Sequence, residues 1–354
     1  MTSHILVFVL ALILSLVGTP VARRVAVRLG VLDMPGERKI HASPIPLLGG
    51  ASVYLAFMLA VVLFGGSQPA GYLSQLAAIL AGATLVAAVG FWDDSRGKRL
   101  GPLIKLASQL LAAGVLMWAG IRVEFLHDPV LNVIVTALWV VGITNALNFL
   151  DNMDGLSTGV AAVAAAFFFL LAITNGQFLV ASLSAALLGA ALGFLRYNLI
   201  LSGNSGSEAS KATIFVGDMG ALFFGFVLAA LGIKLRFENT DVITWMIPVL
   251  VLGLPILDMT LVVLSRARRG VPAYVGGKDH FSHRLVYLGL SRREAVLVLY
   301  LVAVAFGMSS MFLLSTSVVE AYFTAVAILF VCSMVLMRLE RIPLEGGGET
   351  TPGR

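Results

Sequence analysis

Cysteine is nearly absent from this sequence, and charged residues are scarce. The one cysteine, Cys332, lies within an apolar run, which excludes an intrachain disulfide and argues against a cysteine-ligated metal site. Only 12% of the residues are Asp, Glu, Lys or Arg, whereas a soluble domain carries roughly 25%. This shortage of charge excludes an ordinary water-soluble globular protein.

Apolar residues make up 59% of the chain and are grouped in long runs. A helix needs about 20 such residues to cross the hydrocarbon core of a bilayer. We predict an all-α polytopic membrane protein, with one integral-membrane domain over residues 1–342 and a flexible, glycine-rich cytoplasmic tail over 343–354. The sequence has about eleven candidate transmembrane helices: 3–22, 46–65, 73–92, 102–120, 131–150, 156–174, 177–195, 217–235, 242–265, 294–314 and 318–337.

The lysines and arginines lie between the apolar runs, so the net charge of +5 indicates membrane topology and not nucleic-acid binding. If the N-terminus faces out and the spans alternate, all but three of the 24 cations fall on the cytoplasmic side. The three exceptions are Arg122, Lys234 and Arg236. The positive-inside rule therefore predicts an outside N-terminus and an inside C-terminus, with catalytic loops facing the cytoplasm.

Acid and amide side chains gather where the spans reach this predicted cytoplasmic face. Ionisable groups at membrane helices are costly and usually functional. Asp258 lies about two helical turns inside the ninth span, from which it could reach the same cavity. The others are Asp93 and Asp94 after the third span, Asn145, Asn148, Asp151 and Asp154 around the end of the fifth, and Asp218 at the start of the eighth.

This cluster of oxygen donors without cysteine suits a hard cation such as Mg²⁺, with Mn²⁺ as the alternative. Asn148, Asp151 and Asp154 are spaced by three, so they share one face if that segment is helical. Two phosphate groups approach each other only when a cation neutralises them. The cationic side chains that could complete such a clamp are Lys39, His41, Lys105 and Arg284.

Two other interpretations of these charges stay open. An acid at a helix end often serves only as a solvated cap, and acids on one side of a bundle also occur in proton or cation transporters. Asp279 is interpreted as a solvated loop charge, and the arginines at 266, 268 and 269 as a topology anchor.

Several motifs together resemble a known family, the polyprenyl-phosphate N-acetylhexosamine-1-phosphate transferases that include WecA, TagO and MraY. The resemblance extends from about Arg38 to Ala295 and is closest to the WecA type. Its motifs are R-K-I-H-A-S-P-I-P-L-L-G-G (38–50), F-W-D-D-S-R-G (91–97), N-A-L-N-F-L-D-N-M-D-G-L (145–156), I-F-V-G-D-M-G (214–220), P-I-L-D (255–258) and D-H-F-S-H-R-L (279–285).

The resemblance implies a Mg²⁺-dependent transfer of a sugar-1-phosphate from a cytosolic UDP-N-acetylhexosamine to polyprenyl phosphate, with release of UMP. By this resemblance Asp93 would activate the lipid phosphate, Asp218 and Asn148 would bind the metal, and Phe215 would stack on uracil. The other residues implied in catalysis are Asp94, Lys105, Asp151, His280, His283 and Arg284, and those implied in the uridine pocket are Asn152, Met153, Asp154 and Asn198.

The sequence departs from the family pattern at several of these positions. Asn152 stands where the family usually has glycine, Ser282 replaces a histidine, and Thr213 replaces a lysine. About ten extra residues rich in Ser and Gly separate Asn198 from Asp218, which could shift Asn198 out of register. We expect an active enzyme nevertheless, because the acids are all retained.

UDP-GlcNAc is the expected donor and undecaprenyl phosphate the expected acceptor, in the first membrane step of cell-envelope polysaccharide synthesis at the bacterial inner membrane. Another UDP-amino sugar, such as QuiNAc or FucNAc, stays open. From other classes, a membrane transporter and an inactive scaffold also stay open. The family resemblance is compatible with a homodimer.

Overall fold

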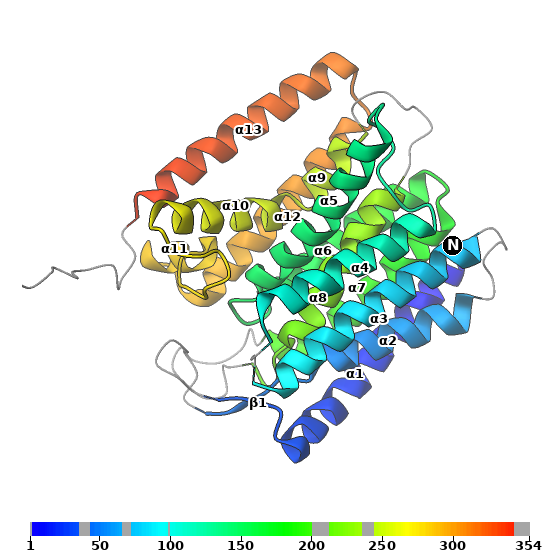
Figure 1. The fold of residues 1–354 in the computed structure, drawn as a ribbon, viewed down its shortest axis with the longest axis vertical. Helices are drawn as coiled ribbons and strands as arrows, with labels where there is room; N and C mark the ends of the chain where they lie inside the picture. The colour runs from blue at the N-terminus through cyan, green and yellow to red at the C-terminus, as the bar shows by residue number, and fades with distance from the viewer. Residues whose placement is uncertain are drawn as a thin grey trace, which may run out of the picture.

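The computed structural model describes residues 2–34, 43–65, 72–97, 100–199, 212–235 and 244–342, and these are almost entirely α-helical (Figure 1). The predicted all-α polytopic architecture is confirmed. The motif residues 38–42 with Lys39 and His41, most of the insertion after Asn198, and the tail 343–354 lie outside the described residues. The division into a domain and a tail stays a prediction.

Ten of the predicted spans correspond to single helices. Their bounds are within three residues of those expected, except that α1 continues seven residues beyond the predicted end at residue 22. This agreement arises because each apolar run is separated from the next by Gly, Pro or charged residues. The helices are α1 (Thr2–Leu29), α2 (Gly49–Gly65), α3 (Leu73–Ser95), α4 (Pro102–Trp118), α5 (Pro129–Leu150), α6 (Leu156–Thr174), α7 (Phe178–Asn198), α8 (Gly217–Lys234), α12 (Arg292–Leu313) and α13 (Val318–Glu340).

The ninth predicted span, 242–265, is wrong as one helix. It is divided at Leu252 into α9 (Met246–Val251) and α10 (Gly253–Arg268). Gly253 and Pro255 follow the break, and proline cannot donate a helical hydrogen bond. A further short helix that sequence periodicity did not indicate, α11 (Phe281–Tyr287), follows the loop after α10.

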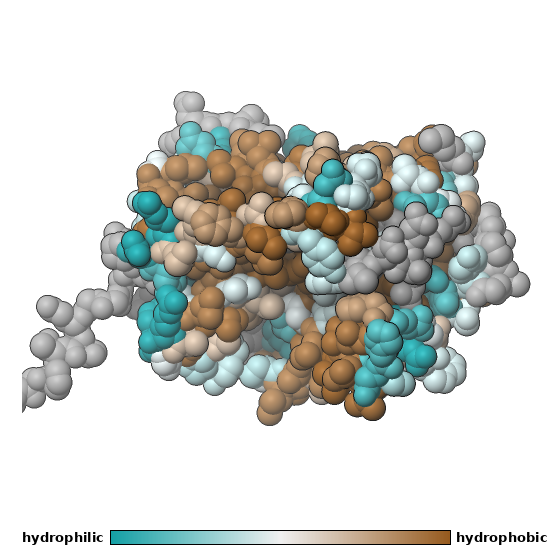
Figure 2. All heavy atoms as spheres, turned by 90° about the horizontal axis from the view of Figure 1, so that it is seen from above, coloured by the Kyte–Doolittle hydropathy of each residue, from teal (hydrophilic) through white to brown (hydrophobic). Residues whose placement is uncertain are grey.

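Within the described ranges, eight helices are long and apolar enough to cross a membrane, and α2 and α4 are shorter apolar helices. Figure 2 shows apolar side chains over the middle of the visible face, with polar residues gathered toward its left and right edges. This distribution is the one expected of a bundle surrounded by lipid. The count of about eleven spans and the outside N-terminus stay predictions.

A two-stranded antiparallel pair, β1 (Leu32–Asp33) with β2 (Ile45–Pro46), lies at the end of the bundle where α1 ends. The segment before α8 continues this pairing, because the Phe215 amide donates to the Pro46 carbonyl at 2.9 Å. The Gly49 amide in turn donates to the Phe215 carbonyl at 3.0 Å. These bonds fix the start of α8 against the start of α2.

Helix α8 is the centre of the bundle, and every residue from Gly217 to Ile233 is buried. It packs against α2, α3 and α5. Glycines allow these backbones to approach closely, as small residues do in membrane helix pairs. A Cβ atom at Gly90 of α3 would lie 2.5 Å from the Met219 Cα. The contact between α3 and α8 therefore depends on the absence of a side chain one turn before the acids that end α3.

Replacing Gly90 with alanine tests this dependence. We expect Gly90→Ala to lower the melting temperature of the detergent-purified protein, because the added methyl group meets backbone that cannot move aside, at a cost of about 1–3 kcal/mol. Gly114→Ala on α4 is the matched control, since a Cβ there meets nothing within 4 Å. Equal melting temperatures for Gly90→Ala and the wild type would contradict the packing described here.

Candidate active site

The ends of four helices, α3, α4, α5 and α8, meet at one end of the bundle, at the lower left of Figure 1. Helices α3 and α5 end there, and α4 and α8 begin there. The neighbouring loop between α10 and α11 approaches the end of α5, where Arg266 lies over the Phe149 ring at 5.7 Å. Most of the polar residues identified from sequence are on these segments.

Lys105 joins two buried carboxylates. Its ammonium group lies 2.5 Å from Asp93 Oδ2 and also pairs with Asp218 Oδ2. Asp93 and Asp218 are only 1% and 6% exposed, so each carboxylate needs a counter-charge to offset its loss of hydration. The second oxygen of Asp93 accepts a hydrogen bond from the Leu100 amide at 2.8 Å, which fixes the turn between α3 and α4. The structure thus brings together side chains from three different helices, α3, α4 and α8.

Asp94 lies beside Asp93 and accepts hydrogen bonds from the backbone of α8. Its two oxygens accept from the amides of Asp218 and Met219, both at 3.0 Å. A carboxylate at this place satisfies amides that the first turn of a helix leaves unpaired. Gly217 makes the approach possible, since its φ is +69° and a Cβ there would lie 2.5 Å from Asp94 Oδ2. Asp94 therefore positions Asp218.

The loop after α5 departs from the predicted helical face. Helix α5 ends at Leu150 with Asp151 as its C-cap, so Asp151 and Asp154 do not share a helix face with Asn148. That expectation was wrong because the chain turns here, reaching φ +78° at Gly155. Asp151 accepts from the Ser157 hydroxyl at 2.8 Å, and Asp154, which is exposed, accepts from the Ala212 amide at 3.1 Å.

Asn148 lies in the last turn of α5 and is partly exposed. Its side chain makes no hydrogen bond within the described ranges, which leaves its amide oxygen available to a ligand. No group of three or more His, Cys, Asp or Glu in the described chain is arranged to hold a metal ion. Two buried carboxylates that converge on one cationic group, in a donor set without sulfur, nevertheless fit Mg²⁺, which takes one or two protein carboxylates plus water and phosphate.

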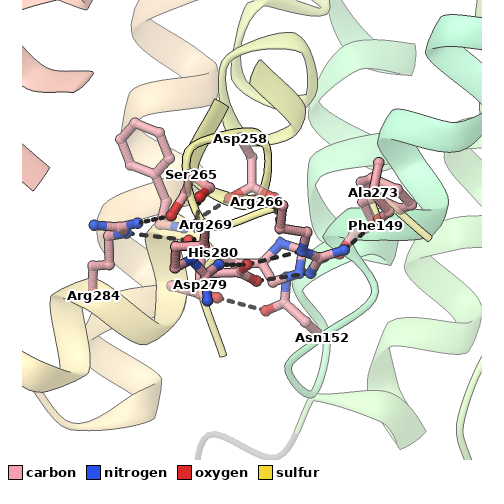
Figure 3. A network of polar contacts seen from close by, with 12 residues as sticks. Phe149, Asn152, Asp258, Ser265, Arg266, Arg269, Ala273, Asp279, His280 and Arg284 are labelled. Carbon is pink, nitrogen blue, oxygen red and sulfur yellow. Dashed lines mark hydrogen bonds and ion pairs between the residues drawn. The ribbon is translucent and has the colours of Figure 1, made fainter. Parts of the chain in front are cut away.

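The segment from α10 to α11 is held by buried ion pairs (Figure 3). Arg266 donates to both oxygens of Asp279, at 2.7 and 2.8 Å, and Arg269 adds a third bond at 2.6 Å. The bonds from Arg266 hold the pKa of Asp279 at about 2, against the effect of burial. Asp279 is therefore not the solvated loop charge that sequence suggested, and Arg266 and Arg269 are more than topology anchors.

Asp258 faces this same segment, and its predicted place in one cavity with the other acids stays a prediction. Its Oδ2 lies 2.8 Å from His280 Nδ1, and its Oδ1 accepts from the Phe281 amide at 2.8 Å. The carboxylate thus fixes both the start of α11 and the orientation of the His280 ring. His283 lies beside it, with ring centroids 5.8 Å apart.

His283 is uncharged near neutral pH. Burial, assisted by the nearby His280, lowers the pKa of His283 to about 4. Its Nδ1 is buried and has no hydrogen-bond partner within the chain as described. A neutral imidazole can donate or accept a hydrogen bond but supplies no positive charge to a phosphate.

Comparison with known proteins identifies the family. The model of glycosyl transferase family 4 matches residues 76–236, which contain α3 to α8 and the Asp93–Lys105–Asp218 group. A Bacillus subtilis protein named "Probable undecaprenyl-phosphate N-acetylglucosaminyl 1-phosphate transferase" is 31% identical over 323 residues, 89% of this chain and 86% of the relative. The chain belongs to glycosyl transferase family 4.

Two further relatives are also similar to this family 4 member over most of both chains. The decaprenyl-phosphate N-acetylglucosaminephosphotransferase of Mycobacterium tuberculosis is 32% identical over 342 residues, 86% of this chain and 81% of the relative. The undecaprenyl-phosphate alpha-N-acetylglucosaminyl 1-phosphate transferase of Escherichia coli K12 is 26% identical over 297 residues, 80% and 76% of the two chains. The similarity therefore covers most of the bundle and is not confined to one motif.

Two residues that the resemblance placed at the substrate, Arg284 and Asn198, are engaged by protein groups in this family 4 member, and their implied substrate contacts stay predictions. Arg284 is buried and donates to the Asp279 carbonyl and the Ser265 hydroxyl, both at 3.1 Å. It also bonds Leu339 and Glu340 at the end of α13. Asn198 accepts from the Gly155 amide at 3.1 Å and donates to the Ile214 carbonyl at 3.1 Å.

The Asn198 contacts have a structural consequence. They join the loop after α5 to the segment before α8. These two parts of the site are therefore held together despite the long insertion that follows α7. Phe215 is half-buried against Leu47 and Leu48, and Met153 packs beside α10 and α12. The uridine contacts implied for these residues stay predictions.

The depressed pKa of His283 predicts a pH-dependent loss of stability. The unfolded chain binds a proton at about pH 6.5, and the folded chain only near pH 4. The folded state therefore loses stability as the pH falls from about 6.5 to 4, by about 3 kcal/mol at most. The lowered pKa of Asp279 affects the stability only at pH values below this range. We expect melting temperatures between pH 7.5 and 4.5 to fall less steeply for His283→Gln than for wild type.

The matched control for this measurement is His127→Gln, which removes an exposed histidine at the other end of the bundle and should leave the slope unchanged. Parallel pH profiles for wild type and His283→Gln would contradict a buried, neutral His283.

Proposed function

We propose that this family 4 transferase moves N-acetylglucosamine-1-phosphate from UDP-N-acetylglucosamine to a polyprenyl phosphate and releases UMP. The observation that carries the proposal is the convergence of Asp93, Lys105 and Asp218 at one end of an apolar bundle. The names of the three relatives, each similar over four-fifths or more of this chain, support the same transfer.

The bilayer and the helix ends bind different substrates. Lipid surrounds the bundle and fixes the polyprenyl phosphate at the interface, where α3, α4 and α8 meet. The loop after α5 and the start of α11 lie next to this point and would hold the UDP-sugar. Holding two reactants in line converts a bimolecular encounter into an effectively unimolecular step, which is a large part of catalysis in phosphoryl transfer.

In the proposed reaction, an oxygen of the lipid phosphate forms a bond to the phosphorus next to the sugar. The bond from this phosphorus to the bridging oxygen breaks, and its electron pair leaves with UMP. The attacking phosphate is already largely ionised near pH 7, so no general base is required. Asp93 then acts by holding Lys105 and orienting the acceptor, and Lys105 offsets the charge of the phosphates.

We propose further that Asp218 and Asn148 hold Mg²⁺, or Mn²⁺ in its place. When bound, the cation neutralises diphosphate oxygens and stabilises charge on the leaving group. Asp94 supports this role because its bonds to the first amides of α8 fix the backbone from which the Asp218 carboxylate projects. The low exposure of Asp218 also strengthens any electrostatic interaction that it makes.

The direct test is UMP release from UDP-N-acetylglucosamine by the purified protein, with undecaprenyl phosphate and with or without Mg²⁺. We expect release to require both the lipid and the metal. Asp218→Asn, which removes one charge at constant shape, should lower kcat by roughly 100-fold or more. The control is Asp128→Asn, the same change at a helix cap at the opposite end of the bundle.

The outcomes of this assay separate the alternatives. Release with another UDP-amino sugar but not with UDP-N-acetylglucosamine would keep the reaction and change the donor. Full turnover by Asp218→Asn would contradict the metal assignment, and no release with any donor would contradict the enzymatic function.

We also propose that this end of the bundle faces the cytoplasm at the bacterial inner membrane, because the cations of the sequence concentrate beside it. In a Cys332→Ala background, Ser95→Cys should be shielded from a membrane-impermeant maleimide in spheroplasts and react after permeabilisation. Asn175→Cys, which is exposed at the end of α6 far from the site, should react with the maleimide in intact spheroplasts. Labelling of Ser95→Cys in intact spheroplasts would contradict this orientation.

A further inference from the structure

Asn152 and Ser282 are joined by a hydrogen bond although 130 residues separate them in sequence. The Ser282 hydroxyl donates to Asn152 Oδ1 at 2.5 Å, as Figure 3 shows for Asn152. Both residues are departures from the family pattern described above, and the structure brings the two departures into contact. Neither residue would have suggested the other from sequence.

The geometry at Asn152 fixes the orientation of its side-chain amide. Its Nδ2 donates to the Phe149 carbonyl at 3.0 Å, in the last turn of α5. With the amide nitrogen engaged there, the amide oxygen faces Ser282. The side chain therefore spans from the end of α5 to the start of α11, and Ser282 is fully buried, so water does not compete for the bond.

The two segments that this bond joins are each held firmly on their own side. The start of α11 is fixed by Asp258, which bonds His280 and the Phe281 amide. The loop after α5 is fixed at its far end, where Asn198 and the Tyr300 hydroxyl both bond Gly155. A bond between two rigid segments sets their spacing at little cost in conformational entropy.

Ser282 also lies directly between functional candidates on α11. The rings of His280 and His283 are neighbours, and His283 Nδ1 is buried without a hydrogen-bond partner in the chain as described. A buried polar atom of this kind is satisfied by a group outside the chain, which is a water, an ion or a ligand. The position of α11 relative to the loop after α5 thus decides where this atom lies with respect to a nucleotide held by that loop.

We propose that the hydrogen bond between Asn152 and Ser282 positions the UDP-sugar, by holding the loop 151–155 at a fixed distance from His280 and His283. This inference rests on the proposed function. Asn152 and Ser282 are positioning residues that act through the loop and the two histidines. Because both residues contribute to one bond, loss of either removes that bond, and loss of Asn152 also removes its bond to the Phe149 carbonyl.

The test is a double-mutant cycle with Asn152→Ala, Ser282→Ala and the double variant, assayed for UMP release at varied UDP-sugar concentration. We expect each single variant to raise KM for the UDP-sugar about fivefold to tenfold, with kcat within about twofold, since uniform binding is lost. The double variant should have the KM of Asn152→Ala and not the product of the two single effects, because the partners are coupled.

Two further variants separate positioning from folding. Ser282→Thr keeps the hydroxyl and should restore KM toward the wild-type value. Ser309→Ala, which removes a half-buried serine on α12, should change neither parameter. A fall in kcat at constant KM, or effects of the two single variants that multiply in the double variant, would overturn the positioning role.

The melting temperatures of the same four proteins, measured without substrate, give a second test that does not depend on turnover. Coupling between the two substitutions is expected there also, and its absence would show that the bond is not formed. Coupling in an inactive wild-type protein would mean that the proposed function fails, and the positioning role with it, while the contact itself stands.

Discussion

Every buried acid at the active end of this bundle has a specific partner, and the arrangement of the site depends on that requirement. A carboxylate removed from water beside an apolar core is costly unless it is paired or hydrogen-bonded. Asp93 and Asp218 share Lys105, Asp94 takes the first amides of α8, Asp258 takes His280, and Asp279 takes Arg266. Because each partner comes from a different helix or loop, the pairs also fix the helix ends relative to one another.

These pairs form two groups with different properties. The first group, at α3, α4 and α8, has a lysine shared by two acids and is suited to phosphates and a cation. The second, at α10 and α11, has fully engaged arginines and a neutral His283, so it offers geometry and hydrogen bonds more than charge. The Asn152–Ser282 bond connects the second group to the loop after α5.

Much of this could be predicted from sequence. Long apolar runs indicated most helix positions, and the concentration of acids at one face indicated that Asp93 and Asp218 lie near each other. Lys105 was one of four cationic side chains that could complete a phosphate clamp there. The break at Leu252 was missed, because hydropathy does not register a local turn inside an apolar run. The end of α5 at Leu150 was predicted, but the turn that separates Asp151 and Asp154 from the face of Asn148 was not. The pairing of Arg266 with Asp279 and the burial of Arg284 were also missed, since they depend on how loops fold back onto α10.

The central claim is that Asp93 and Asp218 face one point, where a positive charge is required. The most direct measurement is the melting temperature of Lys105→Met across a Mg²⁺ titration without substrate. The account predicts a protein less stable than wild type that regains stability as Mg²⁺ replaces the lost ammonium, and no such recovery in Lys105→Met/Asp218→Asn. A Lys105→Met protein as stable as wild type and indifferent to Mg²⁺ would contradict it.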